Sequence, residues 1–376
     1  GVLGNQNTPN NYPTYPILQS SGSAVFGDRI ITGYAPKYLV QNLGWEKTYA
    51  WEAGAEIRFL DNRLSIEPVY YRKNTKDLIV ELASFAGAKN SLQNLGEIEN
   101  KGWELSASWN DKAKDSDFSY SFSGNLTTIK NTVLSLGRGK DDALYNGTKG
   151  ISRTLEGHPI GHFYGYKVIG VYQNNDDISN SPKNTLTDVL PGDLKFADIN
   201  GDGKITPADR TEIGNPTPDF TYGFNVSLAY KGFDLTADFM GVYGNEIYRG
   251  WGESEYAILN YQAHRMGRWR GAGTSNWEPV IDNSRAINRM NSNYYIEDGS
   301  FFRFRNLQIG YSLPQQVLER LKVKKIRVYA NAQNIKTWHK NTGYTPEIGG
   351  SALAFGIDGG TYPMPMILTY GINLTF

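Results

Sequence analysis

The sequence predicts an all-β fold, a transmembrane antiparallel β-barrel, and two observations support this prediction. Apolar and small polar residues alternate strictly along several long segments, as they do in strands that have one apolar and one polar face. The connections between these segments alternate between short and long along the chain. Barrels that cross a membrane have short turns at one end and long loops at the other, so both observations fit this fold.

The segment 220–230 shows the alternation clearly. Its aromatic and aliphatic residues take every second position, and small or polar residues separate them. A soluble β-sandwich also alternates. However, these segments run for roughly 11–15 residues, against about 5–6 in globular strands, and a tilted membrane strand needs about 9–11. Their apolar faces are rich in Tyr, Trp and Phe, which is typical of membrane-interface girdles. We therefore expect Phe224 and Val226 to face lipid and Asn225 to face the barrel interior.

Nine strands are predicted in this way, near 48–60, 63–75, 97–110, 116–130, 218–231, 232–244, 301–312, 324–337 and 365–376. Short connections at 60–63, 111–115, 230–232 and 313–323 alternate with long ones at about 76–96, 131–217, 245–300 and 338–364. The loops 131–217 and 245–300 are expected to be ordered and extracellular. Membrane barrels usually close with an even number of strands, because an open edge in lipid leaves backbone groups unsatisfied. We therefore expect residues 1–376 to be the C-terminal part of a larger barrel.

Composition excludes several other classes of protein. The 376 residues carry 38 Lys and Arg against 38 Asp and Glu, and this balance argues against a nucleic-acid-binding surface. The absence of Cys excludes disulfides, thiolate metal sites and Cys nucleophiles. The sequence contains no stretch of 18 apolar residues, so it predicts no membrane-spanning helix. The chain begins at Gly1 without an initiator Met, which agrees with the expectation of missing upstream strands.

The clearest local motif covers residues 198–209 and reads Asp-Ile-Asn-Gly-Asp-Gly-Lys-Ile-Thr-Pro-Ala-Asp. Oxygen-bearing side chains at its first, third and fifth positions, Gly at the sixth and a carboxylate at the twelfth match an EF-hand calcium loop. The expected calcium ligands are Asp198, Asn200, Asp202, the Lys204 carbonyl and Asp209. Asp replaces the usual Glu at the last position, and the sequence leaves room for only about one helical turn after it. The alternative is an Asp/Asn/Gly turn without metal. We expect a structural calcium ion that fixes the loop.

The sequence gives little support for a second metal site or for catalysis. His158 and His162 stand four apart, but Pro159 and Gly161 argue against the helix that would let them share a metal, so no metal site is predicted there. No Gly-x-Ser-x-Gly elbow occurs, and no catalytic residue is predicted. The aromatic faces of several Trp residues could stack on sugar rings, although packing within loops is the simpler explanation. These residues are Trp251, Trp269, Trp277 and Trp338.

Several stretches of the sequence, in order along nearly the whole chain, resemble the SusC/RagA-type TonB-dependent transporters. The most specific block runs from Gly192 to Gly223 and contains Gly-Asp-Leu-Lys-Phe-Ala-Asp followed by Gly-Asn-Pro-Thr-Pro-Asp-Phe. The other similar stretches are 1–6, 42–48, 62–65, 70–78, 96–104, 298–307 and 330–334.

The resemblance implies a 22-stranded barrel in the bacterial outer membrane, with an N-terminal plug and earlier strands that are not in this chain. It also implies import of oligosaccharides or peptides, energy from the TonB complex through the missing N-terminal part, and a SusD-like surface lipoprotein as partner. A dimer of such pairs is possible. This chain would supply roughly the last nine strands. Two alternatives stay open: a structural or adhesive outer-membrane barrel that transports nothing, and a secreted, calcium-dependent glycan-binding β module.

Overall fold

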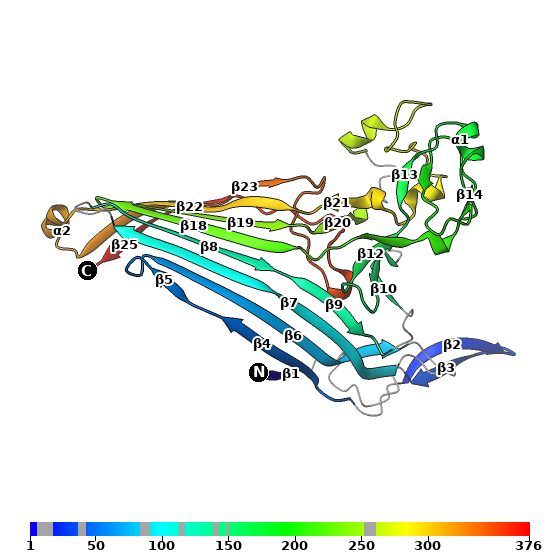
Figure 1. Ribbon diagram of the computed structural model, residues 1–376, viewed down its shortest axis with the longest axis horizontal. Helices are drawn as coiled ribbons and strands as arrows, with labels where there is room; N and C mark the ends of the chain where they lie inside the picture. Colours follow the sequence, from blue (N-terminus) through cyan, green and yellow to red (C-terminus); the bar gives the residue numbers. More distant parts are fainter. Residues whose placement is uncertain are drawn as a thin grey trace.

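The computed structural model describes residues 1–5, 18–36, 43–82, 91–112, 117–137, 143–147, 150–251 and 261–376 of the chain. Its main feature is one long, curved antiparallel sheet, which we call the wall (Figure 1). Each strand of the wall pairs with its neighbour in the order β1, β4, β6, β7, β8, β18, β19, β22, β23 and β25. Within the described residues, β1 and β25 stand at the two ends of this order, and each pairs with one neighbour.

The wall strands span Val2–Asn5 (β1), Glu46–Gly54 (β4), Leu64–Leu82 (β6), Ser91–Lys112 (β7), Ser119–Thr128 (β8), Phe220–Tyr230 (β18), Phe233–Tyr243 (β19), Phe301–Ser312 (β22), Lys325–His339 (β23) and Ile367–Thr375 (β25). Two short strands extend it: β5 (Ile57–Phe59) pairs with β6, and β9 (Lys130–Ser135) pairs with β7. All nine predicted strands are therefore present, with the first divided into β4 and β5. Strand β1 and helix α2 (Gln315–Leu321), which lies in the connection 313–323, were not predicted from the sequence.

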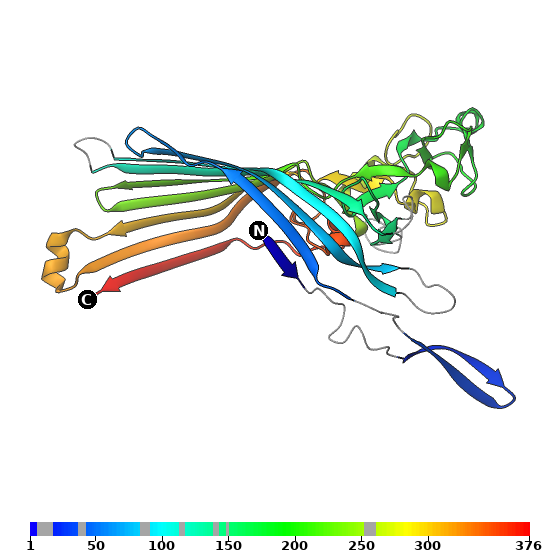
Figure 2. The same ribbon diagram turned by 60° about the horizontal axis from the view of Figure 1, so that its bottom comes forward.

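The short and long connections lie at opposite ends of the wall, as predicted. The turn after β18, helix α2 and the C-terminus lie at one end, while the segments between β9 and β18 and between β19 and β22 lie at the other (Figure 1). A second view shows the curvature of the sheet and the β2–β3 hairpin (Leu18–Phe26 and Arg29–Pro36), which projects beyond the wall at the long-loop end (Figure 2).

The turn between β18 and β19 shows how sequence sets the strand register. Lys231 and Gly232 both have left-handed backbone angles, with φ of 45° and 87°. A two-residue hairpin turn of this kind matches the right-handed twist of its strands. It brings Tyr230 opposite Phe233 and continues in register to the pair Phe220 and Tyr243. The turn therefore aligns the polar and apolar faces of the two strands.

Aromatic side chains of the apolar face gather near both ends of the wall strands. Near the short turns, Phe118 lies beside Tyr230, and Phe233 packs on Tyr311 with 4.4 Å between ring centroids. Near the long loops, Phe220 stacks on Tyr243. Ten residue steps separate Phe220 from Tyr230, about 33 Å along a strand and about 25 Å of height at the usual barrel tilt, which equals the apolar band of a membrane barrel.

The long loops carry the main buried core of the protein. Its members come from the loops 131–217 and 245–300: Ile151, Phe163, Tyr166, Val168, Val171, Leu194, Phe196, Ile205, Tyr248, Ile287, Tyr294 and Tyr295. Tyr166 and Phe196 stack with 4.7 Å between centroids. Burial on this scale orders the described parts of these loops.

The loop elements are short. The strands are Leu144–Asn146 (β10), Ser152–Thr154 (β11), His162–Gly165 (β12), Val168–Val171 (β13), Lys183–Asn184 (β14), Leu194–Phe196 (β15), Lys204–Ile205 (β16), Thr211–Gly214 (β17), Glu246–Arg249 (β20), Ile296–Asp298 (β21) and Ile357–Asp358 (β24). The helical segments are α1 (Asn175–Ser179) and 3₁₀ turns at Pro207–Asp209, Ala263–Gly267, Ala286–Arg289, Asn293–Tyr295 and Ala352–Ala354.

Candidate functional site

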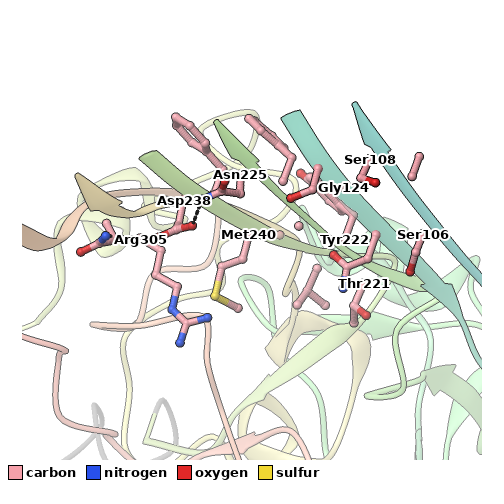
Figure 3. Close-up of a pocket in the computed structure, with 18 of the residues that line it drawn as sticks. Ser106, Ser108, Gly124, Thr221, Tyr222, Asn225, Asp238, Met240 and Arg305 are labelled. Atoms are coloured by element: carbon pink, nitrogen blue, oxygen red, sulfur yellow. Dashed lines mark hydrogen bonds between the residues drawn. The ribbon is translucent and has the colours of Figure 1, made fainter. Parts of the chain in front are cut away.

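The polar face of the wall forms an open hollow of roughly 1190 Å³ (Figure 3). Its lining consists largely of hydroxyl, amide and charged side chains, which can hydrogen-bond to water or to a hydrophilic ligand. Among them are Ser106, Ser108, Ser123, Asn125, Thr221, Asn225, Asp238, Arg305, Asn306 and Gln308. The alternation in β7, β8, β18, β19 and β22 brings most of these groups together on one face.

Asp238 is the centre of a hydrogen-bond network that crosses three strands. Asn225 on β18 donates to its Oδ1 at 2.5 Å, and Asn306 on β22 donates to its Oδ2 at 3.1 Å. The strand register places these residues side by side, because Asp238 is opposite Asn225 on one neighbour and opposite Asn306 on the other. Hydrogen bonds to a charged acceptor are stronger than neutral ones. The network therefore holds both amides in one orientation on the polar face.

A β-bulge in β22 adds a cation to this face. Asn306 pairs with Asp238 and Phe304 with Phe239, so Arg305 is the extra residue between them. Its side chain is exposed and lines the hollow (Figure 3). Among the residues that the structure describes, Arg305 has no hydrogen-bond or ion-pair partner. Arg305 was not predicted as a site residue, although the apolar positions change phase between Phe304 and Leu307 in the sequence.

Arg303 differs from Arg305 although only one residue separates them. Its guanidinium is buried, donates to a Glu347 carboxylate oxygen at 2.6 Å and donates to the Thr337 hydroxyl at 2.8 Å. A buried charge is tolerated when it is paired and hydrogen-bonded. Arg303 thus ties the loop before β25 to the wall, whereas Arg305 is available to a ligand.

The predicted calcium ligands lie in one compact turn within the loop 131–217. Asp198 accepts hydrogen bonds from the backbone N–H groups of Gly201 at 2.7 Å and Gly203 at 2.8 Å. Asn200 and Asp202 each accept one from the residue two positions later, at 3.0 and 2.8 Å. Gly201 and Gly203 have φ of 75° and 79°, left-handed values that a side chain would oppose.

Asp209, the last predicted ligand, is fully buried and binds the other end of the same turn. Its Oδ1 accepts from the backbone of Ile199 at 2.9 Å, and its Oδ2 accepts from the backbone of Thr206 at 2.7 Å. Burial would raise the pKa of Asp209, but hydrogen bonds from Thr206, Ile199 and Asn200 together outweigh it and lower the pKa. The carboxylate therefore stays ionised inside the loop. The calcium site stays a prediction.

The structure places His158 and His162 beside Glu212. One donor atom from each of these side chains lies within 4.8 Å of the other two, and in the part of the chain that is described no other three His, Asp or Glu residues do this. Burial lowers the pKa of His162, and the Pro159 carbonyl and Glu212 oppose this effect. The segment is not helical, as expected. Sequence reasoning missed Glu212, which is 54 residues from His158.

The four Trp residues singled out in the sequence have different surroundings. Trp251 donates from its indole nitrogen to Asp358 at 3.1 Å, and Trp269 packs against the loop core. Trp338 stacks on Phe302 with 5.5 Å between centroids and so belongs to the apolar face of the wall. Trp277 contacts Tyr294 and is 46% exposed, so it combines an open face with an aromatic support in a long loop, whereas the comparably exposed Trp338 lies on the wall.

A comparison with family models decides the family. The model for the TonB-dependent receptor-like β-barrel matches residues 5–335. The chain belongs to this family. Members of the family are outer-membrane proteins, and so this protein is located in the outer membrane. Among the described residues, no helix is both long enough and apolar enough to cross a membrane.

Two receptors of this family illustrate the similarity in sequence. TonB-dependent receptor P3 of Formosa agariphila is 34% identical over 95% of this chain, and TonB-dependent receptor SusC of Bacteroides thetaiotaomicron is 28% identical over 100% of it. In both cases the chain spans 37% of the length of the relative.

Solved structures of the RagAB importer share the fold. The structure of the RagAB peptide importer in the open-open state matches with a TM-score of 0.76 and 20% identity, and the closed-closed state matches with 0.75 and 22%. The first comparison covers 100% of this chain and 39% of the RagAB chain. The predicted similarity to SusC and RagA is therefore confirmed.

Proposed function

We propose that this chain is the C-terminal barrel portion of a SusC-like transporter that imports a hydrophilic oligomer, an oligosaccharide or a peptide, across the outer membrane. The observation that carries this proposal is the polar face of the wall. A sheet whose opposite face suits lipid carries hydroxyl, amide and charged groups along a continuous hollow. Such a face can form the water-filled side of a path across the membrane.

Earlier strands, in the part of the protein outside this chain, would close the barrel around an N-terminal plug. Closure is needed because a free strand edge in lipid leaves backbone N–H and C=O groups without partners. Energy would come from the TonB complex through that N-terminal part. A SusD-like surface lipoprotein would cap the long loops, and two such pairs could form a dimer. Calcium bound by Asp198, Asn200, Asp202, the Lys204 carbonyl and Asp209 would stabilise the loop 131–217.

Both cargo classes have support. The family resemblance seen in the sequence implies an oligosaccharide or a peptide, and the solved importer of similar fold is named for peptides. The chemistry of the hollow serves either class, because Asn and Ser side chains hydrogen-bond to sugar hydroxyls and to peptide amides. Arg305 adds a cation that can bind a carboxylate, present at a peptide C-terminus and in acidic sugars.

The test is uptake by cells that produce the full-length protein together with its lipoprotein partner. Labelled oligosaccharide and peptide mixtures should be compared in cells with and without functional TonB. We expect uptake of one mixture, lost without TonB and reduced by Arg305→Ala. Arg320→Ala, an exposed Arg on α2 at the opposite end of the wall, is the matched control and should leave uptake unchanged.

Two alternatives were open from the sequence. Family membership removes the secreted glycan-binding module, because the protein is an outer-membrane barrel. The non-transporting structural or adhesive barrel predicts no TonB-dependent uptake of either mixture. The uptake experiment therefore separates it from the importer. The predicted lack of catalytic activity agrees with relatives named as receptors.

A further inference from the structure

His158, His162 and Glu212 form a compact cluster in the long loop 131–217, which we call the histidine cluster. His158 Nδ1 lies 3.0 Å from Glu212 Oε2, and the two imidazole rings stack with 5.0 Å between centroids. One donor atom of each residue lies within 4.8 Å of the other two. Ligands of one metal ion that each bind at about 2.0–2.2 Å have to lie this close together.

The backbone around the cluster is fixed without any metal. The carbonyl of His158 accepts a hydrogen bond from the Val133 N–H at 2.9 Å, and Gly157 donates to the Val133 carbonyl at 2.8 Å. Gly161 donates to the Thr154 hydroxyl at 3.0 Å. These bonds hold the turn that carries both histidines against β9 and β11. A ligand site on a rigid turn loses little conformational entropy when it binds.

A β-bulge brings Glu212 to this turn. In the pairing of β12 with β17, Phe163 lies opposite Gly214 and Tyr164 lies opposite Glu212. Ile213 is therefore the extra residue. Bulges re-aim the side chains next to them and occur often beside functional sites. Residues that are 54 positions apart in the sequence meet here because of this pairing.

His162 has the hydrogen bonding of a metal ligand. Its side chain is fully buried, and its Nδ1 lies 3.0 Å from the Pro159 carbonyl oxygen. A carbonyl only accepts, so Nδ1 carries the proton and Nε2 carries a lone pair. Nε2 is itself buried and has no hydrogen-bond partner among the described residues. Histidines that bind metals commonly donate their other ring nitrogen to a carbonyl in this way.

The simpler explanation is an ion pair of His158 with Glu212 beside a structural histidine. It accounts for the 3.0 Å contact. It does not account for the unpartnered Nε2 of His162, since buried polar atoms are rarely left without a partner. A metal ion would satisfy this atom. Arg153 lies opposite His162 on β11, and its positive charge would repel a bound metal ion. The negative charge of Glu212 offsets this repulsion.

We propose that the histidine cluster binds one divalent transition-metal ion, of which Zn²⁺ is the best match. Two imidazole nitrogens and one carboxylate oxygen suit zinc, which often takes three protein ligands and keeps a fourth position open. Calcium prefers oxygen ligands alone, so this site is chemically distinct from the loop 198–209. The bound ion would link the turn that carries the histidines to β17. The proposal does not depend on the transport function.

The test is zinc binding by the full-length protein, purified in detergent without a polyhistidine tag and kept in excess calcium. Zinc affinity and stoichiometry are measured by competition with a chromogenic chelator for the wild type, His162→Gln and Glu212→Gln. We expect the wild type to bind one more Zn²⁺ than either variant, and each variant to lose affinity by more than about 100-fold, beyond the loss typical of outer-shell partners. Cobalt(II) should bind at the same site and give a four-coordinate absorption spectrum in the wild type alone.

His339→Gln is the matched control, because His339 is exposed at the end of β23 and lies outside the cluster. It should bind zinc like the wild type. Glu212 is also exposed, so Glu212→Gln tests the site even if the buried His162 variant folds poorly. Equal zinc binding by the wild type and Glu212→Gln would overturn the proposal, as would the absence of zinc binding by the wild type.

Discussion

The ring of Phe224 stacks on the ring of Phe239, with 4.5 Å between centroids and 17° between planes. One position away on each strand, Asn225 donates a hydrogen bond to Asp238. Successive side chains of a strand point to opposite faces of the sheet. The aromatic pair and the polar pair therefore belong to opposite faces of the same wall, as the sequence predicted.

This arrangement predicts a large difference between neighbouring substitutions. Val226→Lys puts a charge on the apolar face near the middle of β18 and should cost about 2–4 kcal/mol of folding free energy in a bilayer. Asn225→Lys puts the same charge on the polar face beside Asp238 and should cost far less. Denaturant titrations of both variants folded into lipid vesicles give the comparison. Equal costs would contradict the assignment of the two faces.

Calcium should stabilise the loop 198–209 through its side-chain oxygens. Adding calcium to the chelator-treated full-length protein should slow hydrogen exchange of the loop amides, because a bound ion stabilises the state that binds it. Asp202→Ala should abolish the effect. Asp188→Ala removes an exposed acid of the same long loop and should retain it. Calcium-independent exchange in the wild type would remove the calcium site and leave an Asp/Asn/Gly turn.

The stability of the loop 198–209 should depend on pH through Asp209. Its carboxylate has a lowered pKa, so it contributes stability above the unfolded-state pKa and loses this contribution as pH falls through the folded-state pKa. Asp209→Asn should therefore destabilise the loop at pH 7 by about 2 kcal/mol, since hydrogen bonds to a buried charged acceptor are lost. The difference from the wild type should shrink below about pH 4. Hydrogen exchange of the Ile199 and Asn200 amides, measured in excess chelator at several pH values, reports this difference in loop stability. A constant difference across that range would refute the assignment.

We expect Phe376 to affect assembly of the barrel in the outer membrane. It lies one residue beyond β25, so deleting it leaves the pairing of β25 with β23 intact and should barely change the heat stability of assembled protein. The chain ends with apolar residues at every second position, namely Leu368, Tyr370, Ile372, Leu374 and Phe376. A terminal strand of this form resembles the signal read by the barrel assembly machinery. Deletion should therefore lower surface abundance. Phe233→Ala, which removes a girdle ring packed on Tyr311, should instead lower heat stability without reducing abundance. Unchanged abundance with a lower melting temperature after deletion would refute the prediction.

The wall was predictable from sequence because its alternation is local and is repeated in every long strand. The four-residue strand β1 was not, since it is too short to show a period and exists through its pairing with β4. The strands inside the long loops have two to four residues each and depend on tertiary packing. The calcium motif was visible as a continuous sequence. The histidine cluster was not, because Glu212 joins it only through the β12–β17 pairing.

The bulge at Arg305 also affects the geometry of a closed barrel. Strand tilt and diameter in a barrel depend on the stagger between hydrogen-bonded neighbours. One extra residue in β22 changes that stagger on the long-loop side only, and a bulge also bends its strand and increases the local twist. The mouth of the barrel can therefore differ in slope from the part nearer the short turns. A single inserted residue thus contributes to the direction in which the neighbouring strands carry their loops.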